Sequence, residues 1–319
     1  MNINLFEFDD HVINTADFDH YLHGEVVKEF EQAICEYVGA KYAASFFSAS
    51  YALYCIMKSR VCTPSVPLMM HHNVYRFAPT VSVPSMIPPV VPNAIRSVGY
   101  ELDFTDDTAW VGGSYQLLEN VIDSAQRLDR NQYVNECADD DLLVFSFYPT
   151  KPLSSLDGGI VVSNNKEKID DLKSLSFYGM EYHEDSWSRK QIQVGYKAYL
   201  STMQATIAHR NLQNLDEKYE IIDSVRDQYN KEFDLSNTSR HLYRIEVDDN
   251  KKAINHFKER GIVCGVHYAP LHNSPVFSTG QELPSVVAAS EKTLSIPLHH
   301  KLTSSDVSYI IEAVKDYWR

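Results

Sequence analysis

Hydrophobic positions recur along this chain with two spacings, and segments with the two spacings alternate. Residues 24–39 carry apolar side chains three and four positions apart and end in a glycine, a pattern typical of an amphipathic helix. Residues 42–47 are short and apolar and predict a strand, after which Ser48-Ala49-Ser50 opens a second helix. A tight turn of small residues therefore joins a buried strand to a helix N-terminus.

The same patterns extend over the rest of the chain and favour the α/β class. Further strands are expected at 81–83, 108–111, 119–122, 142–147, 159–162, 242–247 and 262–266. Further helices are expected at 166–177, 202–233 and 253–260, and a final one from residue 304 or 305. Residues 62–80 contain three prolines and predict an irregular stretch.

The long helical pattern over residues 202–233 is suited to carry the chain from one domain into the next. We therefore expect a large domain over residues 1–205, with a mostly parallel sheet flanked by helices. A smaller C-terminal α/β domain is expected over residues 206–319. Ligand-binding residues of such folds lie at strand ends and in the turns that follow them.

Composition narrows the possible partners. The 319-residue chain has a formal net charge of −14, and an acidic surface repels nucleic acid and anionic membranes. No apolar run approaches the ~18 residues that span a bilayer, and the acidic N-terminus lacks the features of a signal peptide. Five scattered cysteines indicate free thiols, so we expect a cytoplasmic protein. The thirteen histidines show no metal-binding spacing, and we expect no metal site.

Two charged residues follow buried strands in the middle of the chain. Asp123 comes directly after an apolar run, and Lys151 follows the strand at 142–147 and a short turn. A buried acid and a buried lysine destabilise the folded protein unless each pairs with a group of opposite charge or binds a ligand. With the small-residue turn at a helix N-terminus, they are the parts of a pyridoxal 5'-phosphate (PLP) site. The acid keeps the pyridine nitrogen protonated, the lysine forms a Schiff base, and the helix N-terminus holds the phosphate.

Each of these features also has an ordinary structural explanation. An aspartate after a strand is most often a cap or turn residue, and a single lysine is most often solvated. Ser-Ala-Ser before a helix is most often an N-cap, and Gly158-Gly159 is most often a turn. The order and spacing of the four features are more specific than any one of them, so the combination carries the hypothesis.

The residues around the acid and the lysine resemble the motifs of the DegT/StrS-type nucleotide-sugar aminotransferases. The family pattern D-x-x-Q is matched by Asp123 and Gln126, and the pattern S-F-x-x-T-K by residues 146–151. Asp157-Gly158-Gly159 then follows at the family spacing. Weaker matches lie at 48–53, 266–272 and 295–298. The resemblance covers most of the chain and implies a PLP enzyme of fold type I.

The resemblance also implies a role for each matched residue. Asp123 would pair with the pyridine nitrogen, and Gln126 would bond near the hydroxyl group of the ring. Lys151 would carry the cofactor and then act as acid and base in the proton shift. Ser146 and the Ser48–Ser50 turn would bind the phosphate.

The chain departs from the family pattern in several places. The glycine of the phosphate turn is replaced by Ala49, which resists a positive φ. The aromatic residue that stacks on the cofactor falls at Pro88, and an asparagine that the partner subunit supplies to the phosphate falls at Tyr199. The stretch between residues 103 and 123 is short, so a flanking helix is expected to be missing, while residues 62–80 look inserted.

Relatives of this kind place the active site at a two-fold interface, so the resemblance implies a homodimer. Tyr199 and the 183–196 loop are candidates for contributing to the partner's site. Arg189 and Lys190 are candidates for binding the diphosphate of a nucleotide-sugar, although two adjacent cations are more often simply solvated. His267 and Tyr268 fall in a stretch that borders the site in relatives and are expected to line the substrate pocket.

The resemblance implies transfer of an amino group from an amino-acid donor, usually glutamate, to a nucleotide-linked keto-sugar. Two alternatives stay open at this point. A PLP-dependent sugar dehydratase would carry histidine in place of Lys151, which argues against it. A non-catalytic protein of PLP fold, serving in binding or regulation, would fit the altered phosphate turn and Pro88 but not the intact Asp123, Gln126 and Lys151.

Overall fold

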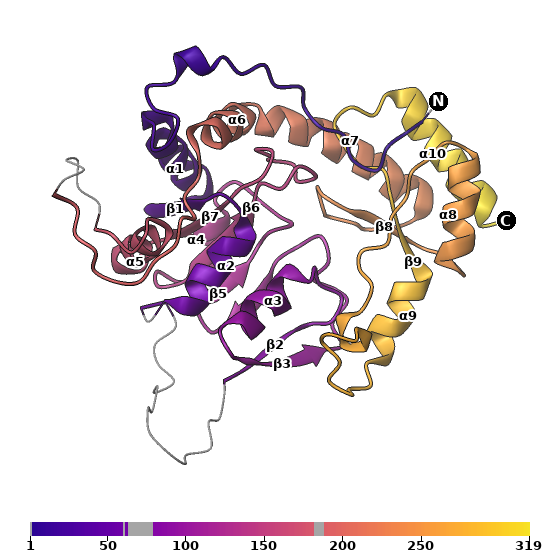
Figure 1. Cartoon of the computed structure of the whole chain (residues 1–319). Coiled ribbons are helices and arrows are strands. Elements are labelled where there is room, and N and C mark those ends of the chain that lie inside the picture. The colour runs from indigo at the N-terminus through magenta and orange to yellow at the C-terminus, as the bar shows by residue number, and fades with distance from the viewer. Residues whose placement is uncertain (1, 60, 63–78, 182–187) are drawn as a thin grey trace.

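The structure is a computed structural model that describes residues 2–59, 61–62, 79–181 and 188–319. A five-stranded sheet lies between helices in the first part of the chain, and a smaller α/β unit with a two-stranded sheet follows (Figure 1). This confirms the α/β fold class. Most of the irregular stretch expected at 62–80 lies outside the described residues. Among the described helices, none is long and apolar enough to cross a membrane.

The main sheet has the strand order β1-β7-β6-β5-β4. Its strands are β1 (Tyr42–Phe46), β7 (Gly159–Ser163), β6 (Leu142–Ser146), β5 (Val121–Asp123) and β4 (Tyr115–Leu118). Two separate pairs are β2 (Thr80–Pro84) with β3 (Glu101–Thr105), and β8 (Tyr243–Glu246) with β9 (Thr293–Ile296).

The expectation of a mostly parallel sheet is wrong, because the main sheet is mixed. Within it, β5 pairs with β6 in parallel, whereas the β1–β7, β6–β7 and β4–β5 pairs are antiparallel. The β4–β5 pair is a hairpin, which needs only a short connection, whereas a parallel crossover needs a dozen or more residues. No helix lies between β3 and β5, as expected from the shortness of this stretch.

Helices flank the sheets along the whole chain. They are α1 (Glu25–Val38), α2 (Ala49–Lys58), α3 (Val90–Ser97), α4 (Gln132–Glu136), α5 (Lys166–Ser176), α6 (Thr202–Gln213), α7 (Leu215–Phe233), α8 (Asn250–Glu259), α9 (Pro284–Lys292) and α10 (Ser304–Tyr317). The described residues also include the short 3-10 helices η1 (Thr15–Asp17) and η3 (Leu271–Asn273).

Successive side chains of the central strands pack alternately into two hydrophobic cores, one on each face of the main sheet. Phe145 and Ile160 belong to a core shared with α1, α6 and α7. Val144 and Val161 point the other way, into a core shared with α2, α3 and α5. This alternation is what a pleated strand dictates, and it explains why β6 and β7 are apolar up to the serine that ends each strand.

Three expected elements differ from the structure. The helix expected over 202–233 is divided at Asn214 into α6 and α7. The strand expected at 108–111 is wrong, because these residues enter a turn in which the N–H of Gly113 donates to the carbonyl of Trp110. The strand expected at 262–266 is reduced to isolated bridges from Ile262 and Gly265.

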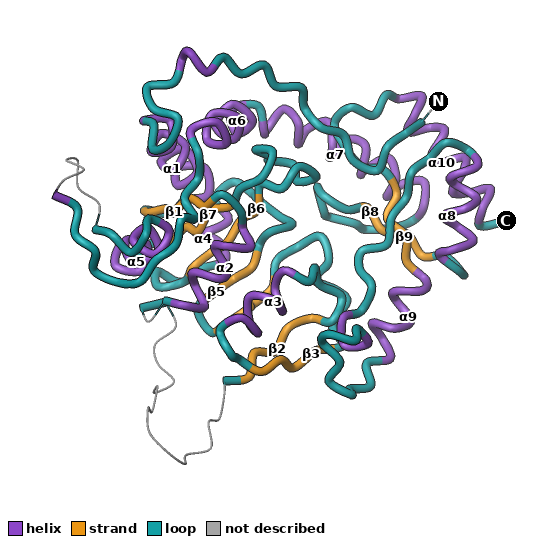
Figure 2. The backbone as a smooth tube through the Cα atoms, viewed as in Figure 1, coloured by secondary structure: helices purple, strands orange, loops and turns teal. Residues whose placement is uncertain are grey.

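The first residues of the chain cross over to its C-terminal part (Figure 2). Ile3 exchanges backbone hydrogen bonds with Gly261 and Val263, and the Asp9 carboxylate pairs with Lys218 and with His300. The proposed division of the chain after residue 205 stays a prediction, but residues 3–9 pack with the second part rather than the first.

Candidate active site

Strand ends of the main sheet bring the predicted site residues together. Asp123 ends β5 and Ser146 ends the neighbouring β6. Ser146 lies opposite Gly159 at the start of β7, and Gly159 also lies opposite Phe46 at the end of β1. Because Ser48, the N-cap of α2, follows Phe46 by two residues, the N-terminus of α2 comes to the same edge of the sheet as Ser146.

Lys151 has a histidine, not a carboxylate, as its partner. Its Nζ lies 3.2 Å from Nε2 of His241, a buried residue just before β8. Burial lowers the pKa of Lys151 to about 8, although the Asp123 carboxylate opposes this shift. Burial and the lysine together hold the pKa of His241 well below its usual value, so the imidazole is neutral and can accept a hydrogen bond from the ammonium.

Asp123 is 5% exposed, and both of its carboxylate oxygens have a hydrogen-bond donor. Oδ1 accepts from the N–H of Ala125 at 2.9 Å, and Oδ2 accepts from the hydroxyl of Tyr115 at 2.8 Å. Burial raises the pKa of Asp123, while these two bonds and Lys151 lower it. Each oxygen of an ionised carboxylate can accept a second hydrogen bond, so acceptor sites remain for a cationic ligand.

Gln126 links the acid to an aromatic wall. Its Oε1 accepts from the N–H of Gly112 at 2.7 Å, and its Nε2 donates to the hydroxyl of Tyr268 at 2.9 Å. The Tyr268 ring stacks on Trp110 with a centroid separation of 6.4 Å and an angle of 10°. Trp110 also makes an edge contact with Tyr115. The structure therefore brings Gln126 and Tyr268 together with Asp123, through aromatic residues that the sequence did not single out.

The turn before α2 adopts an ordinary conformation in spite of the alanine. Ser48 caps α2 by accepting from the N–H of Tyr51, and Ala49 is the first residue of the helix, outside the positive-φ region. The space is supplied by Gly159 instead: a Cβ there would lie 2.4 Å from Cα of Ala49 and 2.5 Å from its N. The N–H groups of the first helical turn lack acceptors within the helix, so they can bind an anion.

His267 lies beside the lysine, on the side of the C-terminal unit. Its Nδ1 is 2.9 Å from the hydroxyl of Ser295 in β9, and the ring of Phe6 contacts both His267 and His241. Burial, Lys151 and Arg244 together lower the pKa of His267 to about 4. His267 is therefore neutral at physiological pH.

Arg189 and Tyr199 lie together at another place. Tyr199 forms a bridge with Phe46 at the end of β1, and its ring contacts His23 at a centroid distance of 4.1 Å. The Arg189 guanidinium lies 4.9 Å from the ring centroid of Phe177, which also contacts Tyr199. The contacts described for these two residues do not include Asp123 or Lys151.

Two other predictions are only partly covered by the structure. Pro88 is partly buried, just before α3, and its carbonyl accepts from Val91. No described contact joins Pro88 to Asp123 or Lys151. Residues 183–187 of the loop that we expect at a partner's site lie outside the described residues.

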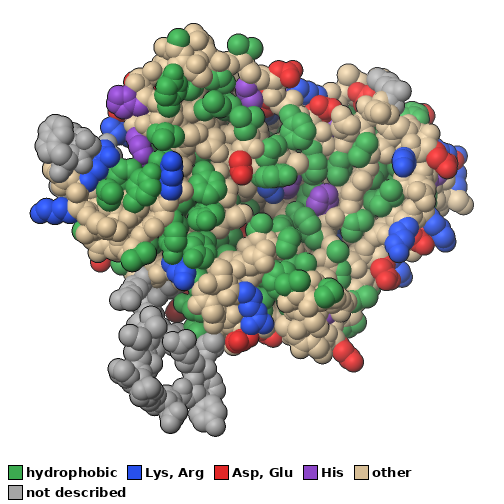
Figure 3. Space-filling view, viewed as in Figure 1, with side chains coloured by type: hydrophobic (Ala, Val, Ile, Leu, Met, Phe, Trp, Pro, Cys, Tyr) green, Lys and Arg blue, Asp and Glu red, His purple; other side chains and the backbone are tan. Residues whose placement is uncertain are grey.

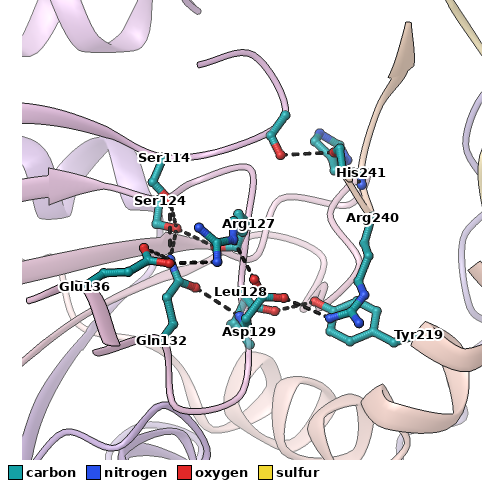
Figure 4. Close-up of polar contacts among 12 residues, drawn as sticks. Ser114, Ser124, Arg127, Leu128, Asp129, Gln132, Glu136, Tyr219, Arg240 and His241 are labelled. Atoms are coloured by element: carbon teal, nitrogen blue, oxygen red, sulfur yellow. Dashed lines mark hydrogen bonds and ion pairs between the residues drawn. The ribbon is translucent and has the colours of Figure 1, made fainter. Parts of the chain in front are cut away.

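A cavity of about 720 Å³ opens beside Gln126, between the main sheet unit and the C-terminal unit. Figure 4 shows the polar network along it, in which Asp129 is bonded both to Arg127 and to Arg240. Arg240 also binds Asp223 of α7 through several hydrogen bonds. Arg240 directly precedes His241, so this network anchors the backbone next to the residue whose imidazole faces Lys151.

The site fits a cofactor that is both anionic and cationic. Asp123 and Lys151 take part in none of the ion pairs of the described residues, although each shifts the other's pKa. A protonated ring nitrogen would supply the cation that the buried carboxylate lacks. A phosphate would supply the anion for the N-terminus of α2 and the Ser146 hydroxyl, which accepts one bond from Tyr148 and remains able to donate.

Sequence comparison identifies the class that this arrangement defines. The profile of the DegT/DnrJ/EryC1/StrS aminotransferase family matches residues 6–69 and 121–315. Because the match covers most of the chain, the chain belongs to this family and is a PLP-dependent aminotransferase. Residues 70–120 lie outside both matched segments, and they contain Pro88, Trp110 and Tyr115.

Individual relatives cover nearly the whole chain. It is 26% identical to the UDP-4-amino-4,6-dideoxy-N-acetyl-beta-L-altrosamine transaminase of Campylobacter jejuni, over 90% of this chain and 88% of that protein. It is 24% identical to the spore coat polysaccharide biosynthesis protein SpsC of Bacillus subtilis, over 96% and 92%.

Among solved structures, the fold is similar to the aminotransferase TlmJ from Streptoalloteichus hindustanus, with a TM-score of 0.82 and 20% identity over 100% of this chain and 99% of that chain. It is also similar to Helicobacter pylori PseC, an aminotransferase involved in the biosynthesis of pseudoaminic acid. Here the TM-score is 0.77, with 18% identity over 98% of both chains.

Proposed function

We propose that this protein transfers an amino group from an amino-acid donor, in the first place glutamate, to a keto-sugar linked to a nucleotide. The relatives named above support the sugar acceptor, since one is a transaminase of a UDP-linked amino sugar and another acts in polysaccharide biosynthesis. The observation that carries the proposal is the placement of Lys151 and Asp123 in one site, where neither forms an ion pair with the residues that the structure describes. Five free cysteines are in keeping with a reducing compartment, for which we propose the cytoplasm.

Lys151 is the residue that we propose to bond to the cofactor and to move the proton. When bound, PLP supplies an aldehyde that condenses with amines and a ring that takes up electrons from a broken bond. A pKa of about 8 leaves part of the Nζ amine neutral near physiological pH, and a neutral amine is both the nucleophile and the base. The neutral His241, 3.2 Å away, would hold Nζ in place without adding a competing charge.

The remaining groups would bind and orient the cofactor. Asp123 would accept the proton-bearing ring nitrogen, and Gln126 would lie along the ring edge. The phosphate would be bound by Ser48, Ser50 and Ser146 together with the amides of Ala49 and Ser50. Tyr268 and Trp110 offer an aromatic surface close to Gln126, and Pro88 stays a proposed packing residue.

A homodimer is the assembly that we propose. Large apolar side chains are exposed around α2 and the loops beside it, including Tyr51, Tyr148, Ile192 and Val194, and Figure 3 shows hydrophobic side chains gathered on this face. Covering them with a second copy would bring Tyr199 and Arg189 to the partner's active site. Light scattering at micromolar concentration should give twice the monomer mass, and Val194→Glu should shift the equilibrium to monomer.

The nucleotide-sugar would lie over the cofactor between His267, Tyr268 and the partner's Arg189. We expect Arg189→Ala and His267→Ala each to raise the Michaelis constant for the nucleotide-sugar. Unchanged Michaelis constants in both variants would show that the acceptor binds elsewhere.

Labelling tests the central assignment. The purified protein with PLP should be yellow, and borohydride should fix the cofactor to the peptide that contains Lys151. Lys151→Ala should still bind PLP, without a covalent bond, and lose transamination by several orders of magnitude. Lys168→Ala is the matched control, since Lys168 is also buried but pairs with Asp140. Labelling of another lysine, together with an active Lys151→Ala protein, would overturn the assignment.

A further inference from the structure

An arginine of the C-terminal unit, Arg244, lies near His267 and forms no ion pair with any residue that the structure describes. Arg244 lies in β8 between Tyr243 and Ile245, whose side chains belong to the hydrophobic core. Since neighbouring residues of a strand point to opposite faces, Arg244 points away from that core. Its Nη1 donates to the carbonyl oxygen of Thr108 at 3.2 Å, while its Nε is buried and has no hydrogen-bond partner among the described residues.

Three other partly buried arginines of this chain are paired with carboxylates. Arg127 and Arg226 each form two ion pairs, and Arg240, four residues before Arg244, pairs with Asp129 and Asp223. For Arg244, burial lowers the pKa and no carboxylate of the described chain offsets it. A guanidinium that is withdrawn from water without an anion destabilises the fold, so its retention points to a ligand that supplies the anion.

The neighbours of Arg244 place that anion close to Lys151. Arg244 lies opposite Ser295 in the β8–β9 pair, and the Ser295 hydroxyl is bonded to His267. Lys151 and Arg244 both lower the pKa of His267, which is therefore neutral and lies near two cations. A ligand that has an amine close to a carboxylate could present the first to Lys151 and the second to Arg244.

We propose that Arg244 binds a carboxylate of the amino-acid donor, an inference that rests on the aminotransferase function proposed above. The bond from Nη1 to Thr108 leaves the edge formed by Nε and Nη2, whose two parallel N–H groups match the two oxygens of a carboxylate. Thr108 belongs to the stretch outside the family match, so the contact that orients Arg244 comes from a part of the chain that departs from the family.

Two other anions of the reaction, the cofactor phosphate and the diphosphate of the nucleotide-sugar, have to be distinguished from the donor carboxylate as ligands of Arg244. The cofactor phosphate has its own proposed place at the N-terminus of α2, with three serine hydroxyls. The diphosphate of a nucleotide-sugar would suit a guanidinium equally well, so the experiment must separate it from the donor. Glutarate, which has the two carboxylates of glutamate without the amine, and UDP serve as the two probes.

The test uses the PLP-loaded protein with Arg244→Met, which keeps the length of the side chain without its charge, and Arg244→Lys. Arg96→Met is the control, since Arg96 forms a surface pair with Glu101. We expect Arg244→Met to weaken glutarate binding, measured by calorimetry, by about a hundredfold, and Arg244→Lys to lie in between. The glutamate concentration for half-maximal single-turnover reaction should rise in parallel, while UDP and PLP affinities stay unchanged.

A second readout separates ligand binding from a structural role. Removing an unpaired buried charge should leave the unfolding temperature of the ligand-free Arg244→Met protein unchanged or raise it, whereas loss of a structural contact would lower it. Unchanged glutarate binding, or weakening confined to UDP or to PLP, would overturn the proposal. If the wild-type protein reacted with no amino acid, the proposed function would fail, while glutarate binding would still decide whether Arg244 receives a carboxylate.

Discussion

The hydroxyl of Tyr115 offers a sharp test of how Asp123 acts on the cofactor. Tyr115→Phe removes only the oxygen that donates to Oδ2 of Asp123 at 2.8 Å and keeps the ring against Trp110. A hydrogen bond to a charged group contributes about 1.5–3 kcal/mol. Without it, the ionised carboxylate that a protonated ring nitrogen requires is less stable, so PLP affinity should fall by up to about 10- to 100-fold.

The assay compares two cofactors. Apoprotein is titrated with PLP and with the 1-deaza analogue, which has carbon in place of the ring nitrogen. Tyr115→Phe should weaken PLP and leave the analogue unaffected, because Asp123 has no cation to bind there. Equal weakening of both cofactors would show that Tyr115 only supports the local structure and would refute the reasoning.

The pH dependence of stability gives an independent reading of the same change. Burial already raises the pKa of Asp123 in the folded protein, and the Tyr115 bond lowers it. When folding raises the pKa of an acid, the folded protein loses stability as the pH rises from the pKa of the unfolded state to the pKa of the folded state. Loss of the Tyr115 bond raises the pKa of Asp123 in the folded protein further. In the apoprotein, Tyr115→Phe should therefore go on losing stability up to a higher pH than the wild type does. Urea unfolding at a series of pH values measures this difference.

Three further outcomes follow from the site. Gly159→Ala would place a Cβ 2.4 Å from Cα of Ala49, so the N-terminus of α2 must shift; we expect about 1–3 kcal/mol of destabilisation and loss of bound PLP on dialysis. Capture of PLP by the apoprotein should quicken as the pH rises through about 8, because the Lys151 amine loses its proton there; a flat profile in stopped-flow absorbance would contradict this. Arg240→Met breaks partly exposed bonds to Asp129 and Asp223 and should cost about 1–3 kcal/mol in urea unfolding.

Local patterns in the sequence were sufficient for the central strands and for the acid and lysine that follow them. β6 and β7 are apolar because both faces of the sheet are covered, and a charged residue after such a strand is conspicuous. The run at 108–111 misled for a physical reason: Trp110 is buried against Tyr268 and Tyr115, not in a sheet. A buried segment is apolar whether it forms a strand of a sheet or an irregular loop, so its composition does not distinguish a strand from a loop.

Other site residues depend on long-range pairing that no local pattern records. Tyr115 reaches Asp123 because it lies opposite it in the β4–β5 hairpin, and that register is set by the fold. His241 meets Lys151 across 90 residues of sequence. Arg244 could be noticed in the sequence as a charged residue between the apolar Tyr243 and Ile245 of a short strand. The alternation of side chains along a strand predicts that it points away from the core, but does not predict which residues it meets.

The path of the first residues has a practical consequence for handling the protein. Phe6 stacks on His241 with a centroid separation of 5.4 Å, and with Lys151 these two residues line a small cavity of about 30 Å³. A protein fragment that begins at α1, the first long helix, would keep every strand of the main sheet and lose only Ile3 from its cores. The purified fragment would lack Phe6, which covers the cavity beside Lys151 and His241. Inactivity of such a fragment would reflect where it was cut, and a synthetic peptide carrying residues 2–9 should restore what the cut removed.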